Sequence, residues 1–296
     1  MQKPTAVAKG LVNWMLFLAL SLIWGSSFIL MKEGMALLSP YQVATIRLLS
    51  AGIVMLPFSY KAVKLVERKT YKFVFAAALT GSFFPAYLYC IAETKIDSSL
   101  AAILNSLTPL CTILIGMAFF NMKAGTKKLA GVLTGFAGLV VLPFAANKGV
   151  NLTGITFSGL VLLATVFYAI NGNLAAKHLS GINAIHVTSL AFAFLIIPCL
   201  VILAATGFFS IGFSHNPPAL RSLLAAILLG VGGSALAYVF FYMLVKRAGV
   251  VFTSLVTYGI PFVAILWGLL DGEVITLAET LCLLVILAGV YIANRK

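Results

Sequence analysis

Ten long apolar runs are the feature that most limits how this chain can fold. They follow one another between residues 11 and 293, with short polar connections between them. A helix of about 20 apolar residues crosses a bilayer with every backbone polar group satisfied inside the segment. The strands of a transmembrane barrel would instead alternate apolar and polar residues over about ten positions. The runs therefore predict an all-α integral membrane protein.

The predicted transmembrane helices span residues 11–31, 41–59, 73–92, 99–120, 128–146, 155–176, 184–206, 221–245, 250–270 and 275–293. Of the 296 residues, 62% are hydrophobic and 9% are charged. A soluble domain has about 45–50% apolar and about 25% charged residues, so this composition excludes both a soluble fold and a disordered chain. The first run is too long for a cleaved signal peptide and predicts a first transmembrane helix.

The basic residues predict the orientation in the membrane. The net charge is +13, from 20 Lys and Arg against 7 Asp and Glu. With a cytoplasmic N-terminus, fifteen of these basic residues fall inside, four fall outside and Arg47 lies within a helix. Cytoplasmic loops carry such an excess, so we expect both termini in the cytoplasm. The same excess needs no nucleic-acid partner, because the bilayer explains it.

Matching residues in the two halves indicate an internal repeat. An offset of 152 residues places Pro109 on Pro261, and the same offset pairs Gly81-Ser82 with Gly233-Ser234. The chain thus divides into five-helix halves, residues 1–148 and 149–296. Five is odd, so the second half must enter the membrane from the opposite side. Inverted repeats recur in secondary transporters, where the substrate site lies near the midplane between the halves.

Polar and aromatic side chains at membrane depth are the candidates for that site. A buried polar group needs a partner, so these residues face either one another or a wet cavity. The predicted substrate-binding residues are Trp24, Ser27, Tyr87, Asn105, Thr108, Tyr168, Asn171, Tyr238, Thr257 and Tyr258. The alternative for each polar group is an ordinary hydrogen bond between helices. For Trp24 and the tyrosines it is apolar packing.

Pro109, Pro261 and Gly233 are the predicted hinge positions, since proline interrupts helix hydrogen bonding. The alternative is a kink or a close approach that serves packing alone. The predicted gating or coupling residues are Arg47, Glu93, Glu273 and Glu279. The carboxylates gather with Lys32 near the predicted outer ends, where they form either ion pairs or a solvated rim. Arg47 either has a functional role, or its side chain extends toward the outer surface or caps helix carbonyls.

Several activities are disfavoured by what the sequence lacks. The four cysteines form no CxxC pair and the three histidines are scattered, so we expect no metal and no cofactor. The sequence lacks the GxxxxGK[ST] motif that would indicate an ATP-driven pump. It also lacks a carboxylate near a helix centre, which would indicate obligate proton coupling. We expect no enzyme. A channel would show rings of like charge or a filter sequence, and neither is visible in the sequence.

Short motifs in a fixed order resemble the EamA family of the drug/metabolite transporter superfamily. They are Trp24-Gly25-Ser26-Ser27-Phe28, Arg47 to Ala51, Leu107-Thr108-Pro109-Leu110, Val251 to Leu255 and Gly272-Glu273. The resemblance covers nearly the whole chain. One departure is that Phe120-Asn121 stands in the first half where the second has Gly272-Glu273.

The resemblance implies export of small metabolites, with amino acids prominent, across the bacterial inner membrane by alternating access. We see no basic residue at the predicted midplane. A neutral or zwitterionic solute is therefore favoured, and the tyrosines and tryptophans favour an aromatic or large apolar amino acid. The alternatives are a nucleoside or nucleotide-sugar carrier, and a facilitator or channel. We expect a monomer or a homodimer.

Overall fold

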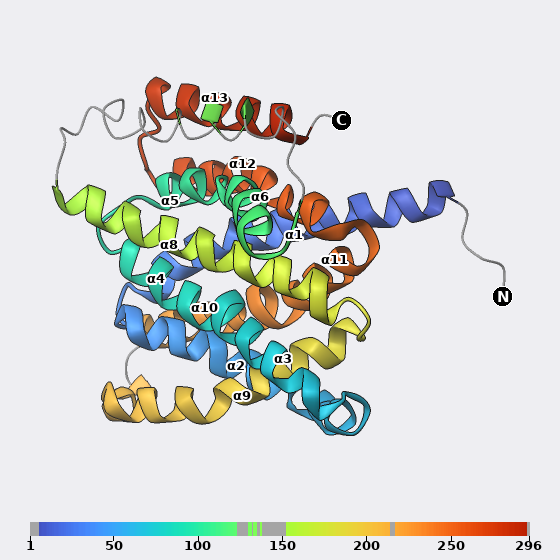
Figure 1. Ribbon diagram of the computed structural model, residues 1–296. Helices are drawn as coiled ribbons and strands as arrows, with labels where there is room; N and C mark the ends of the chain where they lie inside the picture. Colours follow the sequence, from blue (N-terminus) through green and yellow to red (C-terminus); the bar gives the residue numbers. More distant parts are fainter. Residues whose placement is uncertain are drawn as a thin grey trace.

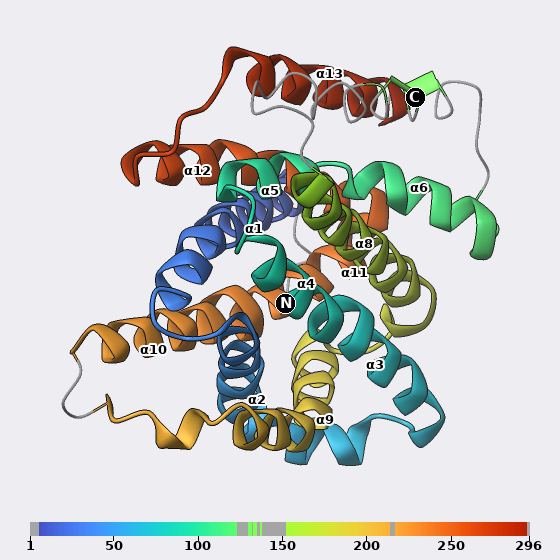
Figure 2. The same ribbon diagram turned by 90° about the vertical axis from the view of Figure 1, so that its left-hand side faces the viewer.

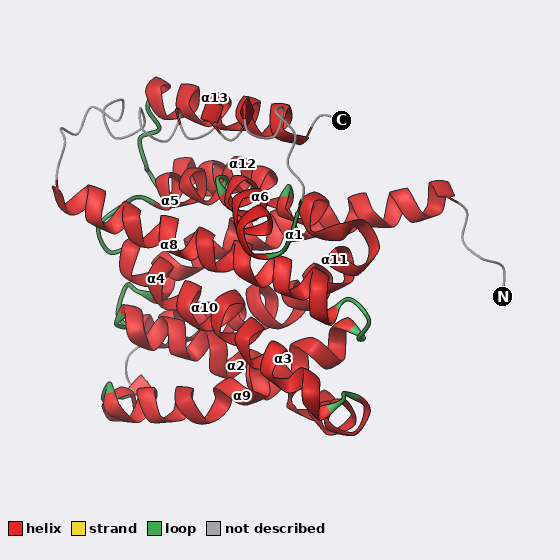
Figure 3. Cartoon of the chain, viewed as in Figure 1, coloured by secondary structure: helices red, strands yellow, loops and turns green. Residues whose placement is uncertain are grey.

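Nine of the ten predicted segments are helices in the computed structural model of the chain (Figure 1). The structure describes residues 6–122, 130–131, 133–134, 137, 152–213 and 217–294. Across these residues no strand occurs, as Figure 3 shows. Most of the predicted segment 128–146 lies outside them. The expected all-α fold is thus confirmed for the described part of the chain.

The helices agree closely with the predicted segments. In the first half they are α1 (Ala6–Gly34), α2 (Pro40–Leu65), α3 (Tyr71–Ala78), α4 (Phe84–Ala92), α5 (Ser98–Asn105) and α6 (Thr108–Phe119). In the second half they are α8 (Leu152–Leu174), α9 (Ala184–Ala205), α10 (Pro217–Gly230), α11 (Ala237–Ser254), α12 (Val256–Leu270) and α13 (Leu277–Asn294). The 3₁₀ turns are Arg68–Thr70 and Phe208–Ser210, and π-helical turns occupy Leu79–Phe83, Ala175–Leu179 and Val231–Leu236.

Seven helical stretches of the described chain are long and apolar enough to cross a membrane. Two shorter apolar helices, Val256–Leu270 and Thr280–Gly289, accompany them. The longest stretch, Pro217–Ser254, is interrupted at Gly249, whose backbone has φ 80° and ψ 167°. Only glycine adopts such a conformation readily. Gly249 therefore lies at the boundary between two predicted helices, 221–245 and 250–270, and the second of these continues into α12.

The two halves share an unusual local structure at matched positions. Leu79–Phe83 and Val231–Leu236 are both π-helical, and the offset between their first residues is the 152 residues of the predicted repeat. Each contains a Gly-Ser pair. A π-helical turn places an extra residue in the helix and is often found at functional sites. The structure therefore repeats the distortion along with the sequence.

Each half also breaks a second helix, but not where the prolines alone predict. In the first half the break falls at Ser106 and Leu107, so Pro109 stands at the start of α6. In the second half it falls at Leu255, and α12 continues as a helix through Pro261. Proline suits the first turn of a helix because its missing N–H has no partner there.

The helices stack in layers that position the centre of the molecule (Figure 2). Helices α2 and α9 pack along each other at one side. Helices α12, α5 and α6 lie at the opposite side, with α13 beyond them. Between these layers run α1, α4, α8 and α11. Helix α1 packs against α12, and α8 packs against α4 and α6. The buried polar side chains of these middle helices meet at the centre.

Candidate substrate cavity

A cavity lies between the two halves. Its wall is largely apolar and aromatic with a few converging polar groups, the usual character of a small-molecule site. Both halves contribute to it. The lining residues are Trp24, Ser27, Phe28, Met31, Arg47, Tyr89, Asn105, Thr108 and Thr112 from the first half, and Tyr168, Asn171, Gly172, Tyr238, Phe241, Val250, Thr253, Ser254, Thr257 and Ile260 from the second.

The structure brings eight of the ten predicted substrate-binding residues to this wall. They are Trp24, Ser27, Asn105, Thr108, Tyr168, Asn171, Tyr238 and Thr257. Arg47, predicted as a gating or coupling residue, lies on the wall with them. The wall therefore includes a residue of α2, a helix that the sequence analysis did not expect to line the cavity.

Tyr87 and Tyr258 lie elsewhere. The Tyr87 hydroxyl is 2.7 Å from Thr45 Oγ1, so this side chain joins α4 to α2. Tyr258 is not among the lining residues, and its buried hydroxyl has no hydrogen-bond partner in the described part of the chain. On α4 it is Tyr89 that reaches the cavity. Two residues along a helix turn by about 200° at 3.6 residues per turn, so Tyr87 and Tyr89 face opposite sides.

Helical spacing identifies the lining residues that the sequence analysis left out. On α1 the cavity is lined at positions 24, 27, 28 and 31, and along α11 and α12 at 250, 253, 254 and 257. Both sets follow the i, i+3, i+4, i+7 pattern of one helix face. Phe28, Met31, Thr253 and Ser254 follow from extending the faces of Trp24 and Thr257.

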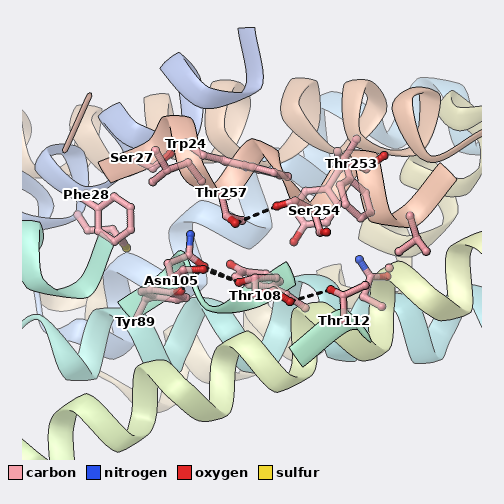
Figure 4. Close-up of a pocket in the computed structure, with 18 of the residues that line it drawn as sticks. Trp24, Ser27, Phe28, Tyr89, Asn105, Thr108, Thr112, Thr253, Ser254 and Thr257 are labelled. Carbon is pink, nitrogen blue, oxygen red and sulfur yellow. Dashed lines mark hydrogen bonds between the residues drawn. The ribbon is translucent and has the colours of Figure 1, made fainter. Parts of the chain in front are cut away.

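Asn105 is the centre of a hydrogen-bonded cluster on one wall (Figure 4). Its Oδ1 accepts a hydrogen bond from the Tyr89 hydroxyl at 2.7 Å and one from Thr108 Oγ1 at 3.1 Å. Thr108 Oγ1 also lies 2.7 Å from the Asn105 carbonyl oxygen. The break between α5 and α6 makes this arrangement possible, because it turns the two helix ends toward the cavity. With Oδ1 occupied, the amide nitrogen is the group that Asn105 presents.

The hydroxyl groups on the wall are arranged to accept hydrogen bonds. Thr112, Thr253, Ser254 and Thr257 each donate to a backbone carbonyl three or four residues earlier in the chain, at 2.8 Å in every case. A hydroxyl has one hydrogen to donate and two lone pairs. These side chains therefore offer acceptor oxygens to the cavity. Figure 4 shows Thr112 and Thr253 gathered at the end remote from Phe28.

Aromatic rings form much of the remaining wall. Trp24 packs on Tyr238 with ring centroids 6.0 Å apart, and Tyr89 stacks on Tyr168 at the same separation. The Trp24 indole N–H donates to the Gly233 carbonyl oxygen at 3.0 Å, which holds the ring in place. A side chain at Gly233 would meet Ser27 Oγ at 2.7 Å. Gly233, predicted as a hinge, thus permits a close approach of α1 to the π-helical turn.

Charged residues join the helix ends at one end of the bundle. Glu273 follows α12, and its side chain is only 5% exposed. Its carboxylate accepts hydrogen bonds from the backbone N–H groups of Ser98 and Ser99 at 3.3 and 3.2 Å, and from Ser99 Oγ at 2.8 Å. Lys32 of α1 forms ion pairs with Glu273, at 3.3 Å, and with Asp271. The carboxylate thereby ties the α12 end to the first turn of α5, where the helix dipole favours an anion.

Glu93 lies beside this cluster, directly after the span Arg68–Ala92. Its Oε2 accepts a hydrogen bond from Ser98 Oγ at 2.9 Å, whereas its buried Oε1 has no partner. Burial, together with the nearby Glu273 charge, raises the pKa of the Glu93 carboxyl to about 8 against the opposing effects of Ser98, Arg47 and Lys32. The side chain of Glu279 lies outside the described residues.

Comparison with known proteins places this architecture in a family. The model of the EamA-like transporter family matches residues 13–143 and again residues 156–295. An uncharacterized transporter of Archaeoglobus fulgidus is 26% identical over 96% of this chain and 99% of its own length. The uncharacterized inner membrane transporter YedA of Escherichia coli is 27% identical over 93% of this chain and 88% of its own.

Two further matches concern function and fold. A probable amino-acid metabolite efflux pump of Salmonella typhimurium is 29% identical over 54% of this chain and 52% of its own length. One solved crystal structure superposes with a TM-score of 0.65, covering 98% of this chain and 97% of the other at 16% identity, which shows a shared fold. The family model matches the chain twice, once in each half, and the two matches together cover most of the sequence. This chain therefore belongs to the EamA-like transporter family.

Proposed function

We propose that this protein is a secondary transporter that exports small metabolites, foremost amino acids, by alternating access. The observation that carries the proposal is the cavity itself, with walls supplied by both halves. Its mixture of aromatic faces with a few hydrogen-bonding groups suits a small amphipathic solute. A site between two repeats is reached from one side of the membrane and then the other as the repeats rock.

The choice of amino acids rests on two supports. One relative, similar over about half of this chain, has the name of a probable amino-acid metabolite efflux pump. The cavity also has both donors, such as the Asn105 amide nitrogen, and acceptors, such as the hydroxyls of Thr253 and Thr257. Rings of Trp24 and Tyr238 form the apolar surface between them. We place the protein in the inner membrane of a bacterium with both termini in the cytoplasm, as a monomer or homodimer acting without a catalytic step.

Counterflow in proteoliposomes tests the proposal. Vesicles are loaded with a mixture of unlabelled amino acids, and the uptake of labelled phenylalanine, leucine and threonine is followed in turn without a pH gradient. Transient accumulation of a label above equilibrium is expected, because a carrier exchanges one solute for another in each cycle. Uptake that never exceeds equilibrium and does not saturate would indicate a channel. No uptake of any amino acid would contradict the proposed substrate class.

A further inference from the structure

Arg47 is the charged residue of the cavity. It lies in α2 and is 6% exposed, and among the described residues on the wall it alone carries a charge at neutral pH. An arginine side chain keeps its charge in proteins. Removing such a charge from water carries a large free-energy cost unless an anion or several hydrogen bonds compensate it. The partners of its guanidinium group therefore indicate what it is for.

Those partners leave the guanidinium incompletely satisfied. Nε donates to Ser234 Oγ at 2.8 Å, which fixes the orientation of the group. Among the described residues, Nη1 has the thioether sulfur of Met31 as its one hydrogen-bond partner, 3.9 Å away, and a thioether is a weak acceptor. Within the described part of the chain no carboxylate forms an ion pair with Arg47; the nearby acidic residues bond to serines and to Lys32 instead.

The second half of the chain holds this arginine in place. Ser234 belongs to the π-helical turn Val231–Leu236 of the second half. At the adjoining Gly230, a Cβ atom would lie 2.3 Å from the Arg47 carbonyl oxygen, so only glycine allows α10 to cross α2 this closely. The guanidinium is thus positioned in advance, as a binding group must be to act without reorganisation.

The charge is not a general requirement of the repeat architecture. Helix α9 follows α8 in the second half as α2 follows α1 in the first, so it is the counterpart of α2 in the repeat. It packs along α2, and its sequence has no Lys or Arg. If an arginine were needed to pack these helices, both halves would require one. A single buried cation on the wall of a central cavity instead suggests a role toward the contents of that cavity.

We propose that Arg47 binds the carboxylate of the transported solute, so that small molecules with a carboxylate group are the substrate class. A carboxylate matches the planar guanidinium with two parallel hydrogen bonds. The wall supplies one positive charge, which suits a carboxylate better than a phosphate or diphosphate. The inference rests on the proposed function, because it assigns one end of the solute in the same cavity.

The rest of the wall orients the remainder of the solute. Phe28 and Tyr89, which pack edge to face at 5.8 Å, lie on the wall with Arg47 and offer apolar surface next to the carboxylate. The acceptor hydroxyls of Thr112 and Thr253 lie at the opposite end (Figure 4). From Trp24 to Met31 the α1 face extends about 10 Å at 1.5 Å per residue. A solute with a carboxylate at one end and an apolar body fits this polarity.

Matched acid and amide pairs test the inference by binding rather than transport. The purified protein in detergent is heated with phenylalanine or phenylalaninamide, leucine or leucinamide, and 3-phenylpropionate or 3-phenylpropionamide, over a range of concentrations. We expect an acid to raise the melting temperature with an affinity about 10- to 100-fold above that of its amide, as for hydrogen bonds to a charged group. In Arg47→Gln this preference should fall to about 1- to 3-fold.

Three further variants separate binding from folding. Arg47→Lys keeps the charge but loses the paired hydrogen bonds, so an intermediate preference is expected. Ser234→Ala releases Nε and should weaken acid binding without changing amide binding. Arg221→Gln removes an exposed arginine paired with Glu33 at 3.0 Å and should behave as the wild type. If Arg47→Gln does not fold, the Arg47→Lys and Ser234→Ala results decide the matter.

The outcomes distinguish this inference from the proposed function. Equal binding of acids and amides, an acid preference that survives in Arg47→Gln, or no stabilisation by any acid would overturn the inference. Counterflow of amino acids that is inhibited equally by acids and amides would keep the transporter and overturn the role of Arg47. Acid binding lost in Arg47→Gln, without any counterflow in the wild type, would keep the role of Arg47 and overturn the transport proposal.

Discussion

Two buried asparagines show how residues of one type serve different purposes in this molecule. Asn105 lies on the cavity wall, where its amide nitrogen faces the solute space. Asn173 lies off the wall, and its Nδ2 donates to the carbonyl oxygens of Thr112 and Ala169 at 3.0 and 2.9 Å. The first is placed to bind solute, and the second joins α8 to α6.

We therefore predict that removing the two amides changes two different properties of the protein. Asn105→Ala should raise the half-saturation concentration for counterflow about 10-fold, the value of one hydrogen bond of about 1.4 kcal/mol. Asn173→Ala should lower the melting temperature by about 2–6 °C with little change in half-saturation. Kinetics in proteoliposomes and melting in detergent measure the two effects. Half-saturation unchanged in Asn105→Ala would place the solute elsewhere.

Glu93 predicts a dependence of stability on pH. Its pKa is about 8 in the folded protein against an ordinary value of 4.5, so between these values the folded state holds a proton that the unfolded state has released. Stability therefore falls as pH rises through this interval and levels off above it. The melting temperature of the wild type should decrease between about pH 5 and pH 8 relative to that of Glu93→Gln. Parallel curves for the two proteins would show that Glu93 is not the protonated group.

At the scale of the element, close crossings of helices depend on particular glycines. A Cβ atom at Gly230 would lie 1.9 Å from Ser50 Oγ and 2.3 Å from the Arg47 carbonyl oxygen. The serine can rotate away, but the carbonyl is part of α2 and cannot. At Gly232, two residues along, a Cβ atom would have no neighbour within 4 Å.

These two glycines form a matched pair for mutation. Gly230→Ala should destabilise the protein by about 1–3 kcal/mol, as overpacking does, and it should displace Arg47. Gly232→Ala should change stability by less than about 0.5 kcal/mol. Melting of the two variants in the same detergent gives the comparison. Equal stabilities would mean that α10 and α2 cross less closely than the structure has them.

Most helices could be predicted from the sequence, and the reason is the bilayer. Continuous apolar runs set the spans, and local signals such as the Ser39 cap with Pro40 at the first turn of α2 set their ends. The break at Leu255 could not be predicted, because no proline marks it. That Tyr89 rather than Tyr87 lines the cavity could not be predicted for a related reason. Both are tyrosines at the same depth, and only the rotation of the packed helix decides which one faces the cavity.

At the scale of the whole molecule, the internal repeat could be predicted from the sequence, but the contribution of α2 to the cavity could not. The offset of 152 residues recurs in the π-helical turns, and the family model matches both halves. The contribution of α2 to the cavity was not visible. Arg47 is brought to the centre by contacts with Ser234 and Gly230, which lie more than 180 residues away in the sequence.

The contact between Glu273 and Ser99 gives the account its most demanding test. Glu273 and Ser99 come from different halves, and their Oε2 and Oγ atoms are 2.8 Å apart. In alternating access this contact must separate in every cycle if it closes a path to the cavity. Counterflow of a labelled amino acid is therefore measured for Ser99→Cys combined with Glu273→Cys, before and after bridging with a short, reducible bifunctional thiol reagent. The account predicts that counterflow is lost on bridging, restored on reduction and unchanged by the reagent in a variant that has either substitution alone. Full counterflow in the bridged protein would contradict it.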